Sequence, residues 1–328
     1  MTPKFALIAV AASLFVLLGC SSLRGSSDEV VTTRNQAAEF IRYGTTYAVR
    51  AEYEQALSLY ENALRLSISV DDQIGVARAL NAIGKIYLAT GDLPTAEAQF
   101  RRAATIAERG VTRAAATASE SMIETLIEST SNLGDVSLRR GDTELALSYF
   151  SDAIELIGER RSTPTAAVVY HNVGAAHNRL GQHELAEQYL RKAFAINDSR
   201  RIHDEAAANL YMLASVYSRR GLFDEAYDFA NRALERDKMI ENPVGIAQDL
   251  FALGTIERRR MRYEAAHEYF TRAFDVYLTL GIVPGVVRAL AALEENAVSM
   301  GNEDDARAYA ARRGTIELRM NLDTGASR

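Results

Sequence analysis

The sequence is poor in residues that several kinds of site and fold require. It has one cysteine in 328 residues, which excludes an intramolecular disulfide and a cysteine-rich zinc site. Its 20 glycines and 5 prolines are far too few for a collagen-like chain. Basic residues are not in excess either, because 37 Lys and Arg face 43 Asp and Glu, for a net charge of −6. Nucleic-acid-binding domains normally carry a basic excess, so we expect no nucleic acid as a partner.

The N-terminal apolar run is too short to cross a membrane. It extends from Phe5 to Leu18 with one interruption at Ser13, about 14 residues, whereas a membrane-spanning helix needs about 20. Lys4 is the only charged residue before Arg24. A basic start, a short apolar run and small residues after it are typical of a secretory signal.

The end of this run reads Leu17, Leu18, Gly19, Cys20, which resembles the bacterial lipoprotein signal. The resemblance implies that residues 1–19 are removed and that Cys20 becomes the lipid attachment site. An ordinary cleaved signal or a short uncleaved anchor is the alternative.

In the lipoprotein family, Ser21 rather than Asp after the cysteine implies the outer membrane of the bacterial envelope, facing the periplasm. Two or more acyl chains anchor a protein stably, so the resemblance also implies membrane attachment through the N-terminal lipid. Residues 20–36 contain Ser, Thr and Gly with little apolar periodicity. We expect them to form a flexible tether.

Internal repetition predicts the fold of the rest of the chain. An alanine recurs with steps of 40, 50, 40, 40, 40 and 40 residues, at Ala56, Ala96, Ala146, Ala186, Ala226, Ala266 and Ala306. Most units have an aromatic or bulky residue four positions later and a second alanine three after that, with Ala230 and Ala310 as departures from the bulky residue. The seventh unit is weaker, with Glu294 where Gly is expected and Arg313 in place of the last alanine.

This pattern resembles the tetratricopeptide repeat, a helix–turn–helix unit, over about residues 37–320. The resemblance implies an all-α fold, a right-handed α-solenoid of about seven repeats with a 40-residue period, followed by a disordered tail at 321–328. A standard unit has about 34 residues, so the extra residues are expected in longer helices or in longer loops.

Two further features of the repeats lead to local predictions. The step of 50 adds ten residues at about Val111–Glu120, enough to lengthen a helix by about three turns. Glycines are expected to end the first helix of each unit in a left-handed conformation, at Gly91, Gly141, Gly181, Gly221 and Gly301.

A search for catalytic chemistry finds no residues on which to base an enzyme. The sequence has no nucleophile elbow, phosphate-binding loop or zinc-protease motif. Its five histidines are not paired at i, i+4; they are His171, His177, His183, His203 and His267. We therefore expect no enzyme activity, no cofactor, no metal and no small-molecule substrate.

In the tetratricopeptide-repeat family the first helices line a concave groove that holds a peptide or protein partner. On that resemblance, the candidate partner-binding residues are Asn81, Lys85, Asn132, Arg139, His171, Asn178, Arg179, Tyr211, Arg219, Phe251, Arg258 and Arg259.

Four of these arginines form a column at intervals of 40 residues, at positions 139, 179, 219 and 259. Guanidinium groups bind carboxylates bidentately, so the column could select an acidic segment or a C-terminal carboxylate. The helix dipole also favours basic residues at helix C-termini, so a purely structural role is the alternative.

These observations lead us to expect a membrane-anchored scaffold or adaptor that binds another envelope protein or peptide. A pilotin-like assembly factor for a pilus or secretion-system secretin is one alternative, and the 40-residue step argues mildly against it. A homo-oligomeric structural lipoprotein is another, and a monomer at all concentrations in light scattering would count against that one.

Overall fold

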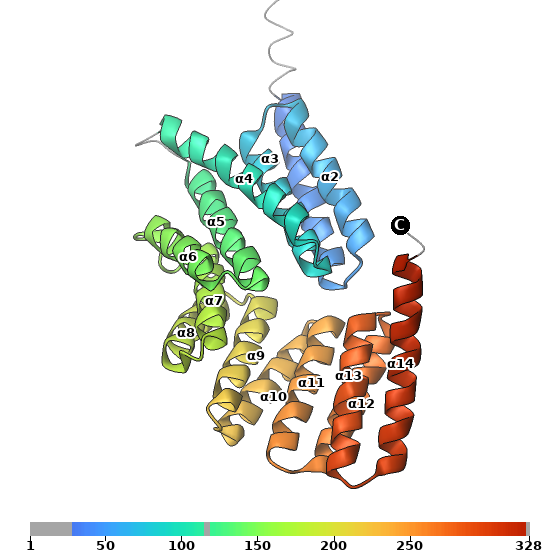
Figure 1. Ribbon diagram of the computed structural model, residues 1–328. Coiled ribbons are helices and arrows are strands. Elements are labelled where there is room, and N and C mark those ends of the chain that lie inside the picture. Colours follow the sequence, from blue (N-terminus) through green and yellow to red (C-terminus); the bar gives the residue numbers. More distant parts are fainter. Residues whose placement is uncertain (1–27, 115–118, 326–328) are drawn as a thin grey trace, which may run out of the picture. The chain divides into compact units, whose positions relative to one another are not determined.

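Helices make up nearly all of the computed structural model, which describes residues 28–114 and 119–325. These residues form 14 helices and no strand (Figure 1). The first helix covers residues 28–49. The others are α2 (Tyr53–Ser69), α3 (Gln73–Thr90), α4 (Leu93–Ala114), α5 (Glu120–Arg140), α6 (Thr143–Ile157), α7 (Pro164–Arg179), α8 (His183–Ser199), α9 (His203–Arg219), α10 (Phe223–Met239), α11 (Pro243–Arg259), α12 (Tyr263–Thr279), α13 (Val283–Ser299) and α14 (Glu303–Gly325).

Consecutive helices pair as repeats. The helix at 28–49 precedes α2 as the first repeat, and α3 packs on α4, α7 on α8, α9 on α10, α11 on α12 and α13 on α14. This arrangement confirms the predicted all-α solenoid of about seven helix–turn–helix repeats.

Longer helices, rather than longer loops, account for the 40-residue period. The six helices α8 to α13 each have 17 residues. Short turns such as Arg200–Ile202 and Arg220–Leu222 separate them. At 1.5 Å per residue, a 17-residue helix is about 26 Å long. Each repeat therefore presents a taller face than a standard 34-residue unit does.

The turns within the repeats use the left-handed backbone conformation, as predicted. Gly91 has φ 86° and Gly181 has φ 76°. At the first of these, the N–H of Asp92 donates to the carbonyl of Tyr87 at 2.9 Å, which satisfies a helix-terminal carbonyl. Met261 occupies the corresponding turn of the sixth repeat with φ 61°, a conformation that is costly for a side chain with a Cβ.

Small residues on the first helix let the second helix approach closely. A Cβ on Gly254 would lie 2.7 Å from the ring of Phe270, and one on Gly84 would lie 2.6 Å from Phe100. The departures from the repeat pattern are compensated locally. In the fifth repeat, Ala230 stands in place of the bulky residue, and Ala214 stands in place of the glycine that faces it in other repeats. Both alanines are fully or almost fully buried.

The seventh repeat compensates its two departures with an ion pair. Arg313, which stands in place of the last alanine, donates from Nη2 to Glu294 at 2.9 Å. Glu294 stands where the other repeats have a glycine or alanine. Two substitutions that weaken the repeat pattern in the sequence therefore contact each other in the structure.

The ten-residue insertion extends the helices on both of its sides. Helix α4 has 22 residues and α5 has 21, against 17 in the regular helices, and residues 115–118 lie outside the described part.

At the chain ends the predicted boundaries are wrong: helix begins at residue 28, not 37, and α14 continues to Gly325. At the N-terminal end, the side chains of Thr32 and Thr33 donate to carbonyls one turn earlier, and Ala37 is buried against the following repeat.

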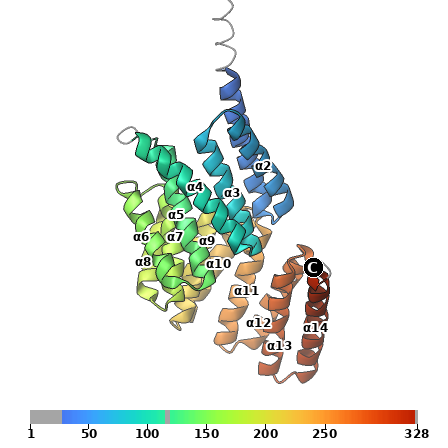
Figure 2. The ribbon, with the colours of Figure 1, turned by 45° about the horizontal axis from the view of Figure 1, so that its top comes forward.

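The chain divides into two compact units, and the boundary lies within α5 between Ser129 and Thr130. In the first unit, Tyr60 of α2 packs with Ile83 and Ile86 of α3. In the second unit one continuous apolar core extends from Ala186 of α8 to Leu293 of α13. The second unit contains the paired helices α9 to α14 (Figure 2), and it carries the largest set of sequence-predicted site residues.

Candidate functional site

A pocket of about 210 Å³ opens on the first helices of the second unit. Its residues come from α9, α11 and α13, and they are Tyr211, Ala214, Ser215, Ser218, Arg219, Phe251, Ala252, Thr255, Ile256, Arg259 and Arg288. We call this the α9–α11 pocket. Four residues predicted from the sequence meet here: Tyr211, Arg219, Phe251 and Arg259.

The packing of the repeats creates this surface. Successive first helices contact one another in the second unit, α7 with α9, α9 with α11 and α11 with α13, so their outward sides form a continuous face. The positions between the large side chains hold small residues, Ser215 on α9 and Ala252 and Thr255 on α11. The hollow exists because these side chains do not fill the space between Tyr211 and Phe251.

Three arginines give the pocket a positive charge. Arg259 donates from Nη1 to the carbonyl of Ser218 at 2.9 Å, and Arg288 donates from Nη2 to the hydroxyl of Tyr277 at 2.6 Å. Arg219 makes no hydrogen bond or ion pair within the described residues. None of the lining residues is acidic. The pocket therefore has cationic donors in excess and no lining carboxylate to neutralise them.

An aromatic wall holds one of these arginines in place. The guanidinium of Arg288 lies 4.4 Å from the ring centroid of Phe251, a distance at which the ring attracts a cation. Phe251 in turn packs against Phe270 with ring centroids 5.3 Å apart. Burial raises the pKa of Tyr211 and of Tyr277, so both phenols are neutral hydrogen-bonding groups at physiological pH.

Two carboxyl groups are buried on α10 and α11. Asp249 on α11 and Asp237 on α10 are 1% and 4% exposed and share a hydrogen bond, and Asn242 donates to Asp237 at 3.0 Å. Burial, together with the neighbouring Asp237, raises the pKa of Asp249 to about 9. Asp249 is therefore protonated and neutral at pH 7.

The arginine column has no single role. Arg179 on α7 donates from Nη1 to the carbonyl of Leu138 on α5 at 2.9 Å. Arg259 on α11 makes the same contact with Ser218 on α9, two first helices further along, so each caps the end of the preceding first helix. Arg139 lies 3.4 Å from Asp135 on its own helix. Of the four, Arg219 is the one whose side chain has no hydrogen-bond or ion-pair partner in the described part of the chain.

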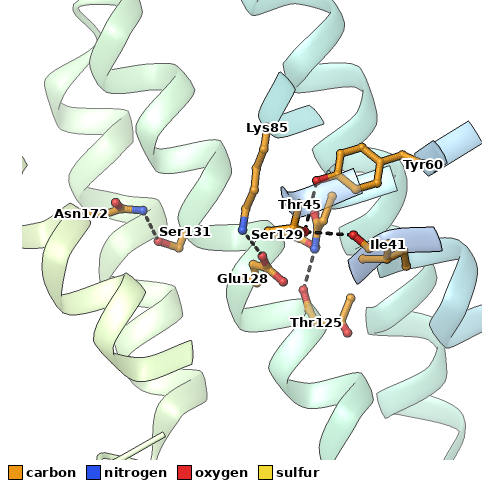
Figure 3. A network of polar contacts seen from close by, with 10 residues as sticks. Ile41, Thr45, Tyr60, Lys85, Thr125, Glu128, Ser129, Ser131 and Asn172 are labelled. Atoms are coloured by element: carbon orange, nitrogen blue, oxygen red, sulfur yellow. Dashed lines mark hydrogen bonds and ion pairs between the residues drawn. The ribbon is translucent and has the colours of Figure 1, made fainter. Parts of the chain in front are cut away.

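The candidates on α3 and α5 belong to polar contacts inside the chain (Figure 3). Lys85 forms an ion pair with Glu128 at 2.5 Å. Asn81 is 1% exposed and accepts from the hydroxyl of Ser129 at 3.0 Å. Asn132 is also buried, at 4% exposure.

The remaining candidates also have partners within the chain. The side chain of Asn178 is buried and donates to Ser215 at 3.2 Å. His171 contacts Asn209 at 2.8 Å, and burial lowers its pKa, so it is a neutral packing residue. Arg258 is paired with Glu295 of α13.

Arg288 is a pocket residue that the repeat pattern of the sequence does not reveal. It lies on the first-helix face of α13 but one turn earlier than the positions compared along the chain. Residues 248 and 208 stand 40 and 80 positions before it and are Gln and Ala, so no basic repeat marks the position. Extending the predicted helix face one turn towards the N-terminus of each first helix would have included it.

Asn172, which donates to Ser131 at 2.9 Å (Figure 3), was missed for a different reason: its neighbour His171 was chosen in its place.

Comparison with known families agrees with the helix pairing. The tetratricopeptide-repeat family matches residues 35–109, 125–199 and 204–279, which together cover more than half of the chain. The chain belongs to the tetratricopeptide-repeat family. The matched segments include every helix that lines the α9–α11 pocket except α13, where the repeat pattern is weakest.

Solved structures share the fold of this tetratricopeptide-repeat chain at low sequence identity. A Rap protein complexed with competence and sporulation factor is 16% identical, with a TM-score of 0.66 over 88% of this chain and 76% of that one. The Rap conjugation regulator of plasmid pLS20, in complex with the Phr* peptide, is 18% identical, with a TM-score of 0.66 over 87% and 74%. Aspartyl phosphate phosphatase F from Bacillus subtilis is 16% identical, with a TM-score of 0.59 over 89% and 73%. At these identities the likeness concerns the fold alone.

Other observations set limits on the site. None of the curated protein sequences is significantly similar to the chain. Within residues 28–114 and 119–325, no helix is long and apolar enough to cross a membrane, and no cluster of three or more His, Asp or Glu side chains could hold a metal ion. Cys20 and the signal segment lie outside the described residues.

Proposed function

We propose that this tetratricopeptide-repeat protein is a membrane-anchored adaptor that binds a peptide segment of another envelope protein on the first-helix face of its second unit. The observation that carries the proposal is the α9–α11 pocket, where an aromatic wall and unpaired guanidinium donors meet. An interaction module of this family uses such a face to hold a partner. Two similar structures are described as complexes, one with a peptide and one with competence and sporulation factor.

The pocket volume favours a peptide over a small metabolite. Small-molecule sites usually occupy about 300–1,000 Å³, and this pocket has about 210 Å³. It has room for one side chain or one chain end, so the other residues of a bound peptide would lie outside it. This geometry also gives no reason to propose catalysis.

Lipid attachment at Cys20 and an outer-membrane location facing the periplasm are part of this proposal. Their support is the Leu17–Cys20 signal and Ser21 in the sequence. The test is incorporation of labelled palmitate into the wild-type protein and into Cys20→Ala, followed by separation of inner and outer membranes. Label in both proteins, or in neither, would contradict the lipid anchor.

The adaptor role is tested by affinity capture from detergent-solubilised envelopes, read by mass spectrometry. We would compare the wild type with Arg219→Glu, and with Arg272→Glu as the matched control. Arg272 is exposed on α12 and its guanidinium lies 5.7 Å from the ring centroid of Tyr269, away from the pocket. We expect one partner that Arg219→Glu loses and Arg272→Glu retains. A partner retained by both variants, or recovery of further copies of the same chain alone, would contradict binding at this face.

A further inference from the structure

Two buried carboxyl groups meet at the junction between the fifth repeat, α9–α10, and the sixth, α11–α12. Asp237 lies in the last turn of α10 and Asp249 in the second turn of α11, and the two side chains share a hydrogen bond. We propose that this pair is a proton-operated latch, which holds α11 against α10 while the two carboxyls share a proton and loosens when that proton is lost. The latch does not depend on the proposed adaptor function.

The preceding junction of the solenoid contains an uncharged version of the pair. Forty residues earlier, the same two positions hold Asn197 on α8 and Asn209 on α9, which are also buried. Nδ2 of Asn197 donates to Oδ1 of Asn209 at 3.0 Å. An amide pair keeps such a bond at any pH, whereas two carboxylates have no proton to donate. The junction between the fifth and sixth repeats is therefore a titratable copy of a structural contact.

The loop between the two helices connects the pair to the start of α11. Nδ2 of Asn242 donates to Oδ1 of Asp237 at 3.0 Å, and Oδ1 of Asn242 accepts from the N–H of Gly245 at 3.2 Å. A Cβ on Gly245 would collide with Oδ2 of Asp237, so this carboxyl rests directly against the first turn of α11. Repulsion between two carboxylates would therefore act between the end of α10 and the start of α11.

The cations beside Asp237 in the sequence are engaged elsewhere. Arg236 pairs with Asp198 of α8 at 2.5 Å, and Lys238 pairs with Glu235 on its own helix at 2.9 Å. Because both cations already have acidic partners, neither is placed to neutralise a charge in the buried pair.

The other groups that face the pair come from α9, α12 and α13. Asp204 of α9 is a further acid, and it contributes to the raised pKa of Asp237. Tyr211 and Tyr277 are neutral because burial raises their pKa, and Arg288 donates to the hydroxyl of Tyr277. A second negative charge at the pair has no counter-ion among these groups, and an uncompensated buried charge strongly destabilises the state that contains it.

The direction of the pH dependence follows from the two states of Asp249. In the closed junction, burial and the neighbouring Asp237 raise the pKa of Asp249 to about 9. In an open junction, water reaches this carboxyl and it ionises near pH 4. The closed state therefore binds one proton more than the open state between about pH 4 and 9, and each rise of one pH unit favours opening about tenfold. Acidification closes the latch.

The junction can open without unfolding the whole chain. In repeat proteins each unit contacts only its neighbours, so stability is approximately a sum over units and junctions. Helix α11 also carries Phe251 and Arg259, which line the α9–α11 pocket. Loosening of α11 from α10 would therefore shift one wall of that pocket, so the latch makes the pocket geometry dependent on pH.

The test is hydrogen–deuterium exchange of the full-length wild type between about pH 5 and 8, read by mass spectrometry and corrected for the intrinsic pH dependence of amide exchange. We expect the open fraction reported by amides of α11 to rise about tenfold per pH unit. Amides of α9, which follows the Asn197–Asn209 pair, should report a constant open fraction. The same pH dependence in both helices, or none in α11, would overturn the latch.

Variants assign the effect to the pair. Replacing Asp237 and Asp249 together by asparagine copies the amide pair of the preceding junction, and exchange in α11 should then no longer depend on pH. Asp228→Asn is the matched control, because it removes an acid of α10 that is exposed and paired with Arg232 at 3.5 Å; its α11 slope should equal that of the wild type. If circular dichroism shows the double variant unfolded, Asp249→Asn alone replaces it. A slope retained without Asp249 would overturn the proposal.

Discussion

Replacing Gly254 by alanine should destabilise the second unit, although the same replacement stabilises most helices. A Cβ at this position would lie 2.7 Å from two ring carbons of Phe270 and 3.1 Å from a third. Ordinary contact begins at about 3.4 Å, so α11 and α12 would have to separate by several tenths of an ångström. Phe270 is fully buried and packs against Phe251, so its ring has no free space into which to move.

The expected magnitude follows from two opposing terms. Forcing an extra carbon into a packed core costs about 1–3 kcal/mol, whereas exchanging Gly for Ala inside a helix gains about 1 kcal/mol. We therefore expect Gly254→Ala to lower the free energy of unfolding by about 1 kcal/mol, with an upper limit of about 2 kcal/mol. The assay is urea denaturation followed by circular dichroism at 222 nm.

Gly314 on α14 supplies the matched control, because a Cβ there would meet no heavy atom within 4 Å. Gly314→Ala should raise the free energy of unfolding by about 0.5–1 kcal/mol, since only the helix propensity changes. The two variants should thus shift the urea midpoint in opposite directions. A Gly254→Ala protein as stable as Gly314→Ala would refute the close-packing explanation of the repeat's small residues.

Three further predictions concern the buried acid, the arginine column and the turns. The raised pKa of Asp249, about 9, keeps this residue protonated in the folded protein, whereas it ionises near pH 4 in the unfolded chain. The free energy of unfolding should therefore fall between about pH 4 and 9, by up to about 1.4 kcal/mol per pH unit. Asp249→Asn should flatten this slope in urea titrations at pH 5 to 8, and an unchanged slope would contradict a neutral buried Asp249. Arg179→Gln removes a donor to the carbonyl of Leu138 and should lower the free energy of unfolding by about 1 kcal/mol, whereas Arg219→Gln should leave it unchanged. Equal losses for the two variants in urea denaturation would argue that the arginines share one structural role. Met261→Gly should raise the melting temperature, because it relieves a residue whose backbone is held at φ 61°. The expected gain in the free energy of unfolding is about 0.5–1 kcal/mol. A lower melting temperature would show that the exposed Met261 side chain makes a stabilising contact.

Periodicity predicted the fold well because it records contacts that every repeat must make. A first-helix glycine or alanine and the residue sixteen positions later touch each other, so Gly84 with Phe100 and Gly254 with Phe270 leave a readable pattern. The exceptions are compensated across the same contact, as with Ala214 and Ala230. A single-position comparison marks such exceptions as weak repeats, whereas the contact pair explains them.

The ends of the solenoid and the pocket were harder to predict. Residues 28–36 have the polar composition of a tether, yet they are the start of the first helix. The helix is held at the next residue, Ala37, which is buried. Along the arginine column, identical side chains have different partners: Arg179 donates to a carbonyl, whereas Arg219 has no partner among the described residues. Sequence spacing gives the helix face on which each lies, but the contacts of a long side chain depend on neighbours from other repeats, such as Tyr277 for Arg288.

The most direct test of the account is photocrosslinking from the pocket itself in intact cells. A benzophenone amino acid would replace Ala252, which lines the pocket, and in a second protein it would replace Asp275, which is exposed on α12. Binding of a partner peptide at the α9–α11 pocket predicts a discrete adduct with another envelope protein from position 252, lost on adding Arg219→Gln, and none from position 275. An adduct from position 275 alone would contradict the account and place the interaction on the second helices.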